Sequence, residues 1–163
     1  MIELREFIAS DADALVELAN NKNVSKYLSG DFPFPYTADD AQWWIGTGSK
    51  EGIQRAILLN GQLVGSVGAT PGIGEREKQA LVGYWLGEPY WGRGIAVNAL
   101  RILVSDVFEN TKIVRVCAWV YQPNNRSSRV LEKAGFEHEA TLAKSLYKHD
   151  KIYDELIYSK INS

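Results

Sequence analysis

Hydrophobic and polar residues alternate along several short stretches of the chain and recur every three to four residues along others. Alternation is typical of strands, and the longer period is typical of helices. Residues 2–8 alternate, with a slip near the end, and predict a half-buried strand. Ser10 precedes a helical pattern that ends near residue 20, so we expect Ser10 to be the N-cap of a first helix. Residues 29–36 contain two prolines, which predict an irregular loop, and Thr37 then begins a second short helix.

The middle of the chain predicts a hairpin, followed by a strand, a glycine turn and a helix. Residues 53–59 and 62–69 flank Asn60-Gly61, a dipeptide that supplies the positive φ angles of a tight turn. A fourth strand at 79–87 leads into a turn at Gly92–Gly94 and an apolar helix. The rest of the pattern predicts a strand at 113–120, a helix at 125–134 and a strand pair at 136–146 and 151–159. This order predicts an α+β fold with one sheet of about six or seven strands and about four helices.

The composition is that of an ordinary globular protein. The chain has 163 residues, of which 45% are hydrophobic and 23% are charged, so collagen-like, low-complexity and disordered classes are excluded. This length is typical of one domain, and we expect residues 1–163 to form a single domain. The net charge of −2 argues against binding to nucleic acid or to a membrane through the overall field. We therefore expect no nucleic-acid partner and no membrane partner.

The small net charge conceals an asymmetry between two parts of the chain. Residues 1–110 carry nine Lys and Arg against fourteen Asp and Glu, whereas residues 111–163 carry nine against six. The acidic part is suited to a cationic partner and the basic part to an anionic one. One cysteine, Cys117, excludes an intramolecular disulfide, and the first residues lack the apolar stretch of a signal peptide. Both features predict a cytoplasmic protein.

The turn at residues 92–97 has the clearest chemistry. Gly92 and Gly94 let the backbone bend and approach a ligand closely, and the first N–H groups of the following helix point outward unpaired. These features predict an anion site. A Walker loop would need Lys and then Ser or Thr after Gly94, and a dinucleotide fingerprint would need a small residue in place of Val97. Neither phosphate motif is present, and a turn that only joins strand to helix is the alternative interpretation.

Three blocks of sequence extend this pattern. They are FPFPYTADDAQWWI at 32–45, GYWLGEPYWGRGIAVNAL at 83–100 and PNNRSSRVLEKAGF at 123–136, with DKIYDELIYSK at 150–160 as a weaker fourth. Together they cover nearly the whole chain, and in this order they resemble the GCN5-related N-acetyltransferases (GNATs), in particular the branch of ribosomal-protein N-terminal acetyltransferases. The resemblance implies a mixed, mostly antiparallel sheet whose central strand pair splays apart. It also implies an enzyme that transfers the acetyl group of acetyl-CoA to an amine.

The resemblance implies which residues bind acetyl-CoA. In the family, the turn Arg/Gln-x-x-Gly-x-Gly/Ala binds the pyrophosphate, and Trp91 here takes the place of Arg or Gln, as is usual in the ribosomal-protein branch. The backbone near Trp85 would bind the pantetheine arm. The implied cofactor-binding residues are Trp85, Leu86, Gly87, Gly92, Arg93, Gly94, Ile95, Ala96, Val97, Asn124, Ser127 and Arg129. A helix cap is the alternative role for Asn124, and a solvated helix face is the alternative for Arg126 and Arg129.

Acetyl transfer needs a neutral amine, a donor to the carbonyl oxygen and a proton source for the departing thiolate. Many family members supply the proton from a tyrosine at the position of Leu131, so the resemblance leaves Ser127 as the catalytic hydroxyl, acting as the acid or positioning the thiolate or a water. A backbone N–H near Leu86 would stabilise the oxyanion, and the amine would attack directly in a ternary complex. No metal is expected. The candidates for the base are Glu75, Glu77, Glu88, His138, His149 and a chain of waters.

The resemblance also implies where the amine acceptor binds. Aromatic residues before the first hairpin lie where the family builds its acceptor groove, and the substrate-binding candidates are Phe32, Phe34, Tyr36 and Trp43. Core packing is the alternative for at least one of the two adjacent tryptophans, Trp43 and Trp44. The acidic part of the chain favours a cationic acceptor, such as a protein N-terminus, a polyamine or another small amine. A non-catalytic acyl-CoA-binding module is the alternative function, and a homodimer is compatible with either.

Overall fold

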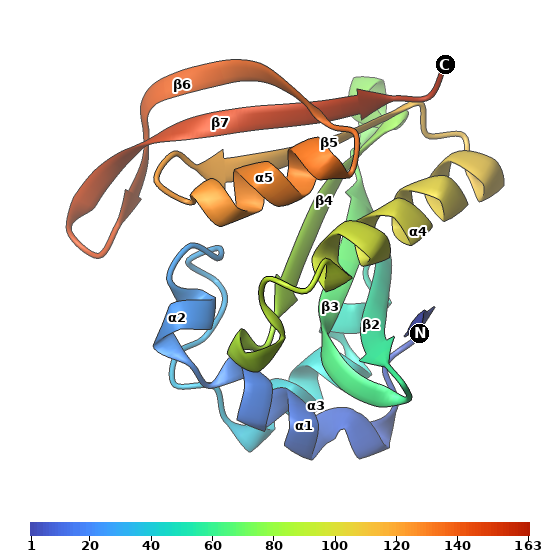
Figure 1. The fold of residues 1–163 in the computed structure, drawn as a ribbon, viewed down its shortest axis with the longest axis vertical. Helices are drawn as coiled ribbons and strands as arrows, with labels where there is room; N and C mark the ends of the chain where they lie inside the picture. The colour runs from blue at the N-terminus through green and yellow to red at the C-terminus, as the bar shows by residue number, and fades with distance from the viewer.

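The computed structural model describes all 163 residues and places seven strands in one sheet (Figure 1). The strand order is β1-β2-β3-β4-β5-β7-β6, and every neighbouring pair is antiparallel except β4 and β5, which run parallel. The strands are β1 (Ile2–Arg5), β2 (Ile53–Leu59), β3 (Gln62–Pro71), β4 (Gln79–Leu86), β5 (Arg115–Tyr121), β6 (Glu137–Lys148) and β7 (Lys151–Ile161). The predicted α+β class and the mixed, mostly antiparallel sheet are confirmed.

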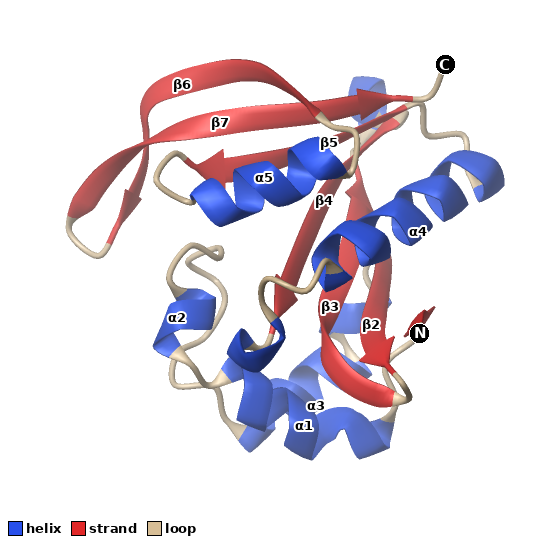
Figure 2. Cartoon of the chain, in the orientation of Figure 1, coloured by secondary structure: helices blue, strands red, loops and turns tan.

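Five α-helices accompany the sheet (Figure 2). They are α1 (Ala12–Ala19), α2 (Lys22–Ser25), α3 (Ala38–Gly46), α4 (Ile95–Asn110) and α5 (Asn125–Lys133). Four of them correspond to predicted helices, and α2 is a single turn that the pattern did not predict. None of the helices has the length and apolar character that a membrane crossing requires.

The start of α1 differs from the prediction that Ser10 is its N-cap. The helix begins at Ala12, after a turn of 3-10 helix, and Ser10 is exposed. Asp11 accepts the backbone N–H of Ile8 at 2.9 Å and pairs with Arg5 at 2.8 Å. A carboxylate that satisfies both an N–H group and a guanidinium is a stronger partner here than a serine hydroxyl. The prediction for Ser10 was therefore wrong: the residue before α1 is Asp11, and the group that bonds there is a carboxylate instead of a hydroxyl.

The helices pack on opposite faces of the sheet, as the alternation along β2 shows. Ile57 lies in the larger hydrophobic cluster, which includes the apolar side of α4. Its neighbours Ala56 and Leu58 lie in the smaller cluster, with residues of α1 and α3. Alternate residues of a strand face opposite sides, so α4 covers one face of the sheet and α1 with α3 covers the other.

The parallel strands β4 and β5 are paired only at one end. The ladder joins Gln79 to Arg115, Ala80 to Val116 and Leu81 to Cys117, and it stops there. Beyond this point β4 continues alongside β3 while β5 continues alongside β7. The splay that the family resemblance implies is present, and it opens a gap in the middle of the sheet.

Candidate functional site

A cavity of about 1080 Å³ lies at the splay between β4 and β5. Its walls come from the ends of both strands, from the turn before α4, from α5 and from residues 23–30. A cavity of this size is at the upper end of those that hold small molecules, which often run to about 1,000 Å³. The splay therefore produces a space large enough for a long ligand.

The glycine turn forms one wall of this cavity. Gly92 and Gly94 both have a φ of 76°, a left-handed conformation that favours glycine. Gly94 directly precedes α4, and the first helical hydrogen bond runs from the N–H of Asn98 to the carbonyl oxygen of Gly94. The N–H groups of the preceding helical residues therefore have no acceptor within the helix. Those N–H groups and the helix dipole favour an anion at this wall.

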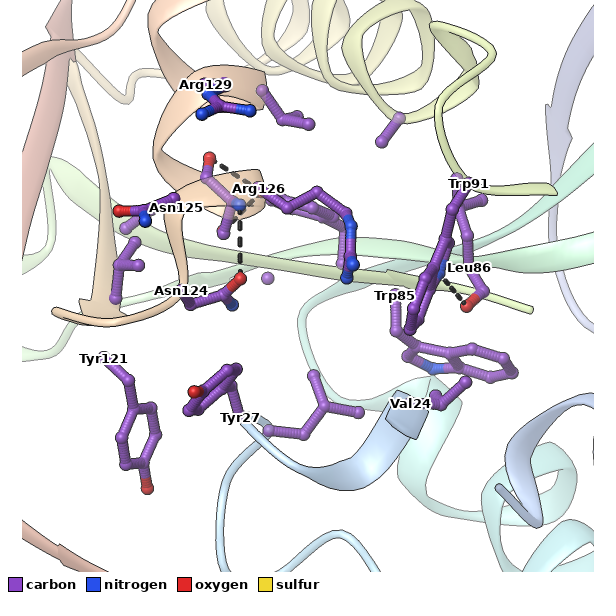
Figure 3. Close-up of a pocket in the computed structure, with 18 of the residues that line it drawn as sticks. Val24, Tyr27, Trp85, Leu86, Trp91, Tyr121, Asn124, Asn125, Arg126 and Arg129 are labelled. Atoms are coloured by element: carbon purple, nitrogen blue, oxygen red, sulfur yellow. Dashed lines mark hydrogen bonds between the residues drawn. The ribbon is translucent and has the colours of Figure 1, made fainter. Parts of the chain in front are cut away.

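Trp91 stabilises the open end of β4. Its indole N–H donates to the carbonyl oxygen of Leu86 at 2.9 Å (Figure 3). The guanidinium of Arg126 lies 3.8 Å from the centre of the Trp91 ring, so a cation–π contact joins α5 to the glycine turn. An Arg or Gln at position 91 would lack this combination of an aromatic face and a single donor.

Asn124 and Ser127 are joined at the start of α5. The side-chain oxygen of Asn124 accepts the backbone N–H of Ser127 at 3.3 Å, as expected of an N-cap. Both residues line the cavity, and the bond uses only the side-chain oxygen of Asn124, so its amide nitrogen is free to donate. The capping role is therefore present, and it leaves room for the predicted role in ligand binding.

The hydroxyl of Ser127 is paired with that of Tyr84 on β4. The two hydroxyl oxygens are 2.6 Å apart and either can be the donor, and the Ser127 carbonyl oxygen is a second possible acceptor for the single Tyr84 hydrogen, at 3.3 Å. Burial raises the pKa of Tyr84 to about 12, although the bond to Ser127 lowers it slightly. Tyr84 therefore stays protonated at neutral pH. When it donates its hydrogen to the Ser127 hydroxyl oxygen, the Ser127 hydrogen is free to point into the cavity. Tyr84 was not among the predicted site residues.

The structure brings most of the predicted cofactor-binding residues together. Those that line the cavity are Trp85, Leu86, Gly92, Gly94, Ile95, Ala96, Val97, Asn124, Ser127 and Arg129. Gly87 and Arg93 lie outside its lining. Gly87 donates its N–H to the Val64 carbonyl oxygen at 2.9 Å, and the Arg93 guanidinium lies 5.6 Å from the Tyr90 ring centre.

None of the four predicted substrate-binding residues lines the cavity. Tyr36 is buried in the smaller hydrophobic cluster and stacks on Phe32 with a centroid distance of 5.5 Å. Phe34 and Trp43 are exposed. The acceptor assignment stays a prediction, and the structure gives the corresponding wall to residues 23–30 instead.

The five side chains named as candidate bases also lie outside the cavity lining. The Glu88 carboxylate accepts the side-chain amides of Asn21 and Asn23, and so ties α2 to the turn after β4. His138 bonds locally within β6. The carboxylate that does line the cavity is Glu155 on β7, which the sequence pattern did not single out.

The sequence profile described as "Acetyltransferase (GNAT) domain" matches residues 2–137. The chain belongs to the GNAT acetyltransferases. The membership agrees with the splayed strands, the glycine turn before α4 and the cavity between them. It makes the chain an N-acetyltransferase of the acyltransferase class, as predicted.

Individual GNAT relatives are similar to the chain over nearly its whole length. The chain is 28% identical to the "Putative ribosomal N-acetyltransferase YdaF" of Bacillus subtilis, over 97% of this chain and 90% of that protein. The structure of RimL, a ribosomal L7/L12 alpha-N-protein acetyltransferase in complex with coenzyme A, superposes with a TM-score of 0.86 and 22% identity, over 98% and 93% of the two chains. The structure of the microcin C7 self-immunity acetyltransferase MccE, in complex with acetyl-CoA and AMP, superposes with a TM-score of 0.83 and 26% identity. The match covers 98% of this chain and 92% of that chain.

This GNAT chain lacks the tyrosine that many family members have in α5. Leu131 occupies that position and is fully buried in the larger hydrophobic cluster. The hydroxyl groups that face the cavity from this part of the fold are therefore those of Ser127 and its partner Tyr84.

Proposed function

We propose that the chain is a single domain that transfers the acetyl group of acetyl-CoA to a primary amine by direct attack in a ternary complex. The observation that carries the proposal is the position of the cavity at the splay, where it is bordered by the glycine turn, α5 and residues 23–30. A donor on the side of the turn and an acceptor on the side of residues 23–30 can meet there. The complexes of RimL with coenzyme A and of MccE with acetyl-CoA support this choice of donor.

The donor is held mainly by backbone groups in this proposal. The N–H groups at the start of α4 bind the pyrophosphate, and the backbone between Trp85 and Gly87 binds the pantetheine arm. Arg126 and Arg129 lie on the neighbouring turn of α5 and add positive charge near the phosphates. An N–H group near Leu86 donates to the carbonyl oxygen of the thioester as that oxygen gains charge.

The chemical step forms a bond between the amine nitrogen and the acetyl carbon and breaks the bond between that carbon and sulfur. The amine loses one proton to a chain of waters, and the thiolate gains one from Ser127, which is reprotonated from the same waters. Ser127 donates its hydrogen to the sulfur, and Tyr84 positions that hydrogen by donating its own to the serine oxygen. A hydroxyl that accepts a hydrogen bond becomes a better donor, so the pair is more effective than Ser127 alone.

The acceptor in this proposal is a protein N-terminal amine or a small-molecule amine. The name of the YdaF relative favours a ribosomal protein, and the acidic part of the chain favours a cation. A cytoplasmic location and a homodimer stay predictions.

The proposal is tested by measuring thiol release from acetyl-CoA in the presence of a panel of peptides with free N-termini, polyamines and other small amines. We expect turnover with at least one of them and the matching acetylated product by mass spectrometry. Tight binding of coenzyme A without turnover on any acceptor would instead support the alternative, a non-catalytic acyl-CoA-binding module.

A further inference from the structure

Glu155 is a buried carboxylate without a cationic partner. Its residue is 9% exposed, it lines the cavity, and its one hydrogen-bond partner is the Ser145 hydroxyl at 3.2 Å. The two ion pairs of the structure join other residues, Arg5 with Asp11 and Arg115 with Glu139. A charge removed from water is costly unless it is paired. The cation that would pair with Glu155 is therefore one that a ligand can supply.

Three tyrosine rings pack against one another, and two of them, Tyr27 and Tyr121, line the same cavity as Glu155. Tyr121 is directly opposite Glu155 in the β5–β7 ladder, so both side chains are on the same face of the sheet. The Tyr121 ring centre is 5.7 Å from that of Tyr27 and 5.3 Å from that of Tyr153. Figure 3 shows the side chains of Tyr27 and Tyr121 close together. Burial raises the pKa of Tyr121, and the charge of Glu155 raises it further.

Aromatic faces beside a carboxylate bind ammonium groups well. The rings already show this preference, because the ammonium of Lys26 lies 5.1 Å from the Tyr27 ring centre and that of Lys148 lies 5.9 Å from the Tyr121 ring centre. Lys148 does not neutralise Glu155. Its ammonium donates to the carbonyl oxygens of Ser25 and Leu28, and so holds the segment after α2 against the β6–β7 hairpin.

Glu155 also faces the side of the sheet from which an acceptor can approach. Tyr84 points to α5, where it meets Ser127, and its neighbour Trp85 packs toward the smaller cluster on the opposite face. Val120 lies in the larger cluster with α4, and its neighbour Tyr121 meets Tyr27 after α2. Side chains alternate between the two faces along β4 and β5. Ser127, which meets Tyr84, is therefore on one side of the splay, and Glu155, which is paired with Tyr121, is on the other.

We propose that Glu155, with the rings of Tyr27 and Tyr121, binds the non-reacting ammonium group of a diamine acceptor, whose other amine attacks the thioester in its neutral form. This inference rests on the proposed function and names the class of its second substrate. It makes Glu155 a specificity-determining residue: an acceptor that carries a second amine as an ammonium ion pairs with the carboxylate, and an acceptor without such a cation leaves the carboxylate unpaired.

The test compares Glu155→Gln with Glu137→Gln, which alters an exposed carboxylate of the neighbouring strand β6. The probe is 1,4-diaminobutane, titrated by calorimetry into protein saturated with coenzyme A. We expect E155Q to weaken binding of the diamine by about tenfold or more, as the loss of a charge-assisted contact implies, and to leave the affinity for acetyl-CoA unchanged. E137Q should change neither. Equal diamine affinity in E155Q and wild type, or no diamine binding by the wild type, would overturn the inference.

Thermal unfolding separates a binding role from a structural one. Removing an unpaired buried charge should leave the Tm of free E155Q equal to or above that of the wild type, whereas a clear fall in Tm would assign Glu155 a structural role and overturn the inference. Binding without acetyl transfer to any amine would contradict the proposed function and leave the Glu155 site standing. Acetyl transfer with the same KM for the amine in E155Q and wild type would support the proposed function and contradict the Glu155 site.

Discussion

The two sides of the splay are built in different ways. The donor side consists of the glycine turn, the first N–H groups of α4 and two hydroxyls, and its residues lie in two continuous blocks, 84–97 and 124–129. The acceptor side brings together Tyr27, Tyr121, Tyr153 and Glu155, which come from three distant parts of the chain. One side is formed mainly by backbone geometry and the other by side-chain chemistry.

This difference explains how one fold can keep its donor and change its acceptor. A backbone turn binds the phosphates of the donor whatever side chains surround it, provided that the glycines are kept. The acceptor side depends on single side chains, and each can change without disturbing the turn. Substitutions on the two sides should therefore alter the two affinities separately.

The largest expected effect is that of Gly94→Val on the donor side. A β-branched residue at a φ of 76° is strained, and the turn would have to move its N–H groups. Loss of two hydrogen bonds to charged oxygens corresponds to roughly a 100-fold weaker affinity for coenzyme A, measured by calorimetry.

The matched control for this change is Gly61→Val in the β2–β3 hairpin. Gly61 has a φ of 83°, and neither glycine has an atom within 4 Å of an added Cβ, so the two substitutions carry a similar conformational cost. G61V should lower stability without changing the affinity for coenzyme A. Unchanged affinity in G94V would remove the turn from the donor site.

A smaller effect is expected from Ser127→Ala, which removes the hydroxyl at the meeting point of the two sides. General acid catalysis contributes about 100-fold or more in typical cases, and a serine is a weak acid, so we expect kcat to fall by about 10-fold to 100-fold. Ser128→Ala is the control, because Ser128 belongs to the same helical turn and does not line the cavity. A kcat that is equal in S127A and S128A would exclude Ser127 from the chemical step.

The last predicted effect is absent at neutral pH and concerns the stability that the buried Tyr84 hydroxyl confers. Its pKa is raised from 10 to about 12, so the folded protein holds this proton more tightly than the unfolded chain does. The contribution is complete below pH 10 and is lost as the pH rises toward 12, with a total of about 3 kcal/mol. The free energy of unfolding of Tyr84→Phe should not show this fall between pH 10 and pH 12. Parallel curves of unfolding free energy against pH for wild type and Y84F would contradict the burial of this hydroxyl.

The sequence predicted the sheet and the donor side because their signals are local. Alternation, the Asn60-Gly61 turn and the glycines before α4 each lie within a few residues, and backbone physics links them directly to structure. The family resemblance added the splay, which no local pattern shows. Tyr84 was missed because its partner, Ser127, is 43 residues away and the pairing depends on how α5 crosses β4.

The acceptor side was the least predictable part. The aromatic residues around Tyr36 stood out in the sequence, yet Tyr36 packs in the hydrophobic cluster beneath α1 and α3. Tyr27 and Glu155 have no distinctive neighbours in sequence. Both line the cavity, and they are linked through Tyr121, which contacts Tyr27 and lies opposite Glu155 because the strand order places β7 beside β5. Long-range contacts of this kind carry no periodic signal.

The central claim is that donor and acceptor meet through the splay from opposite faces of the sheet. It is tested most directly by the crystal structure of the protein with a bisubstrate analogue, in which the sulfur of coenzyme A is joined through an acetyl group to 1,4-diaminobutane. We predict phosphates at the start of α4, sulfur beside Ser127 and the free ammonium beside Glu155. An analogue whose diamine arm lies on the same face as α5, away from Glu155, would contradict it.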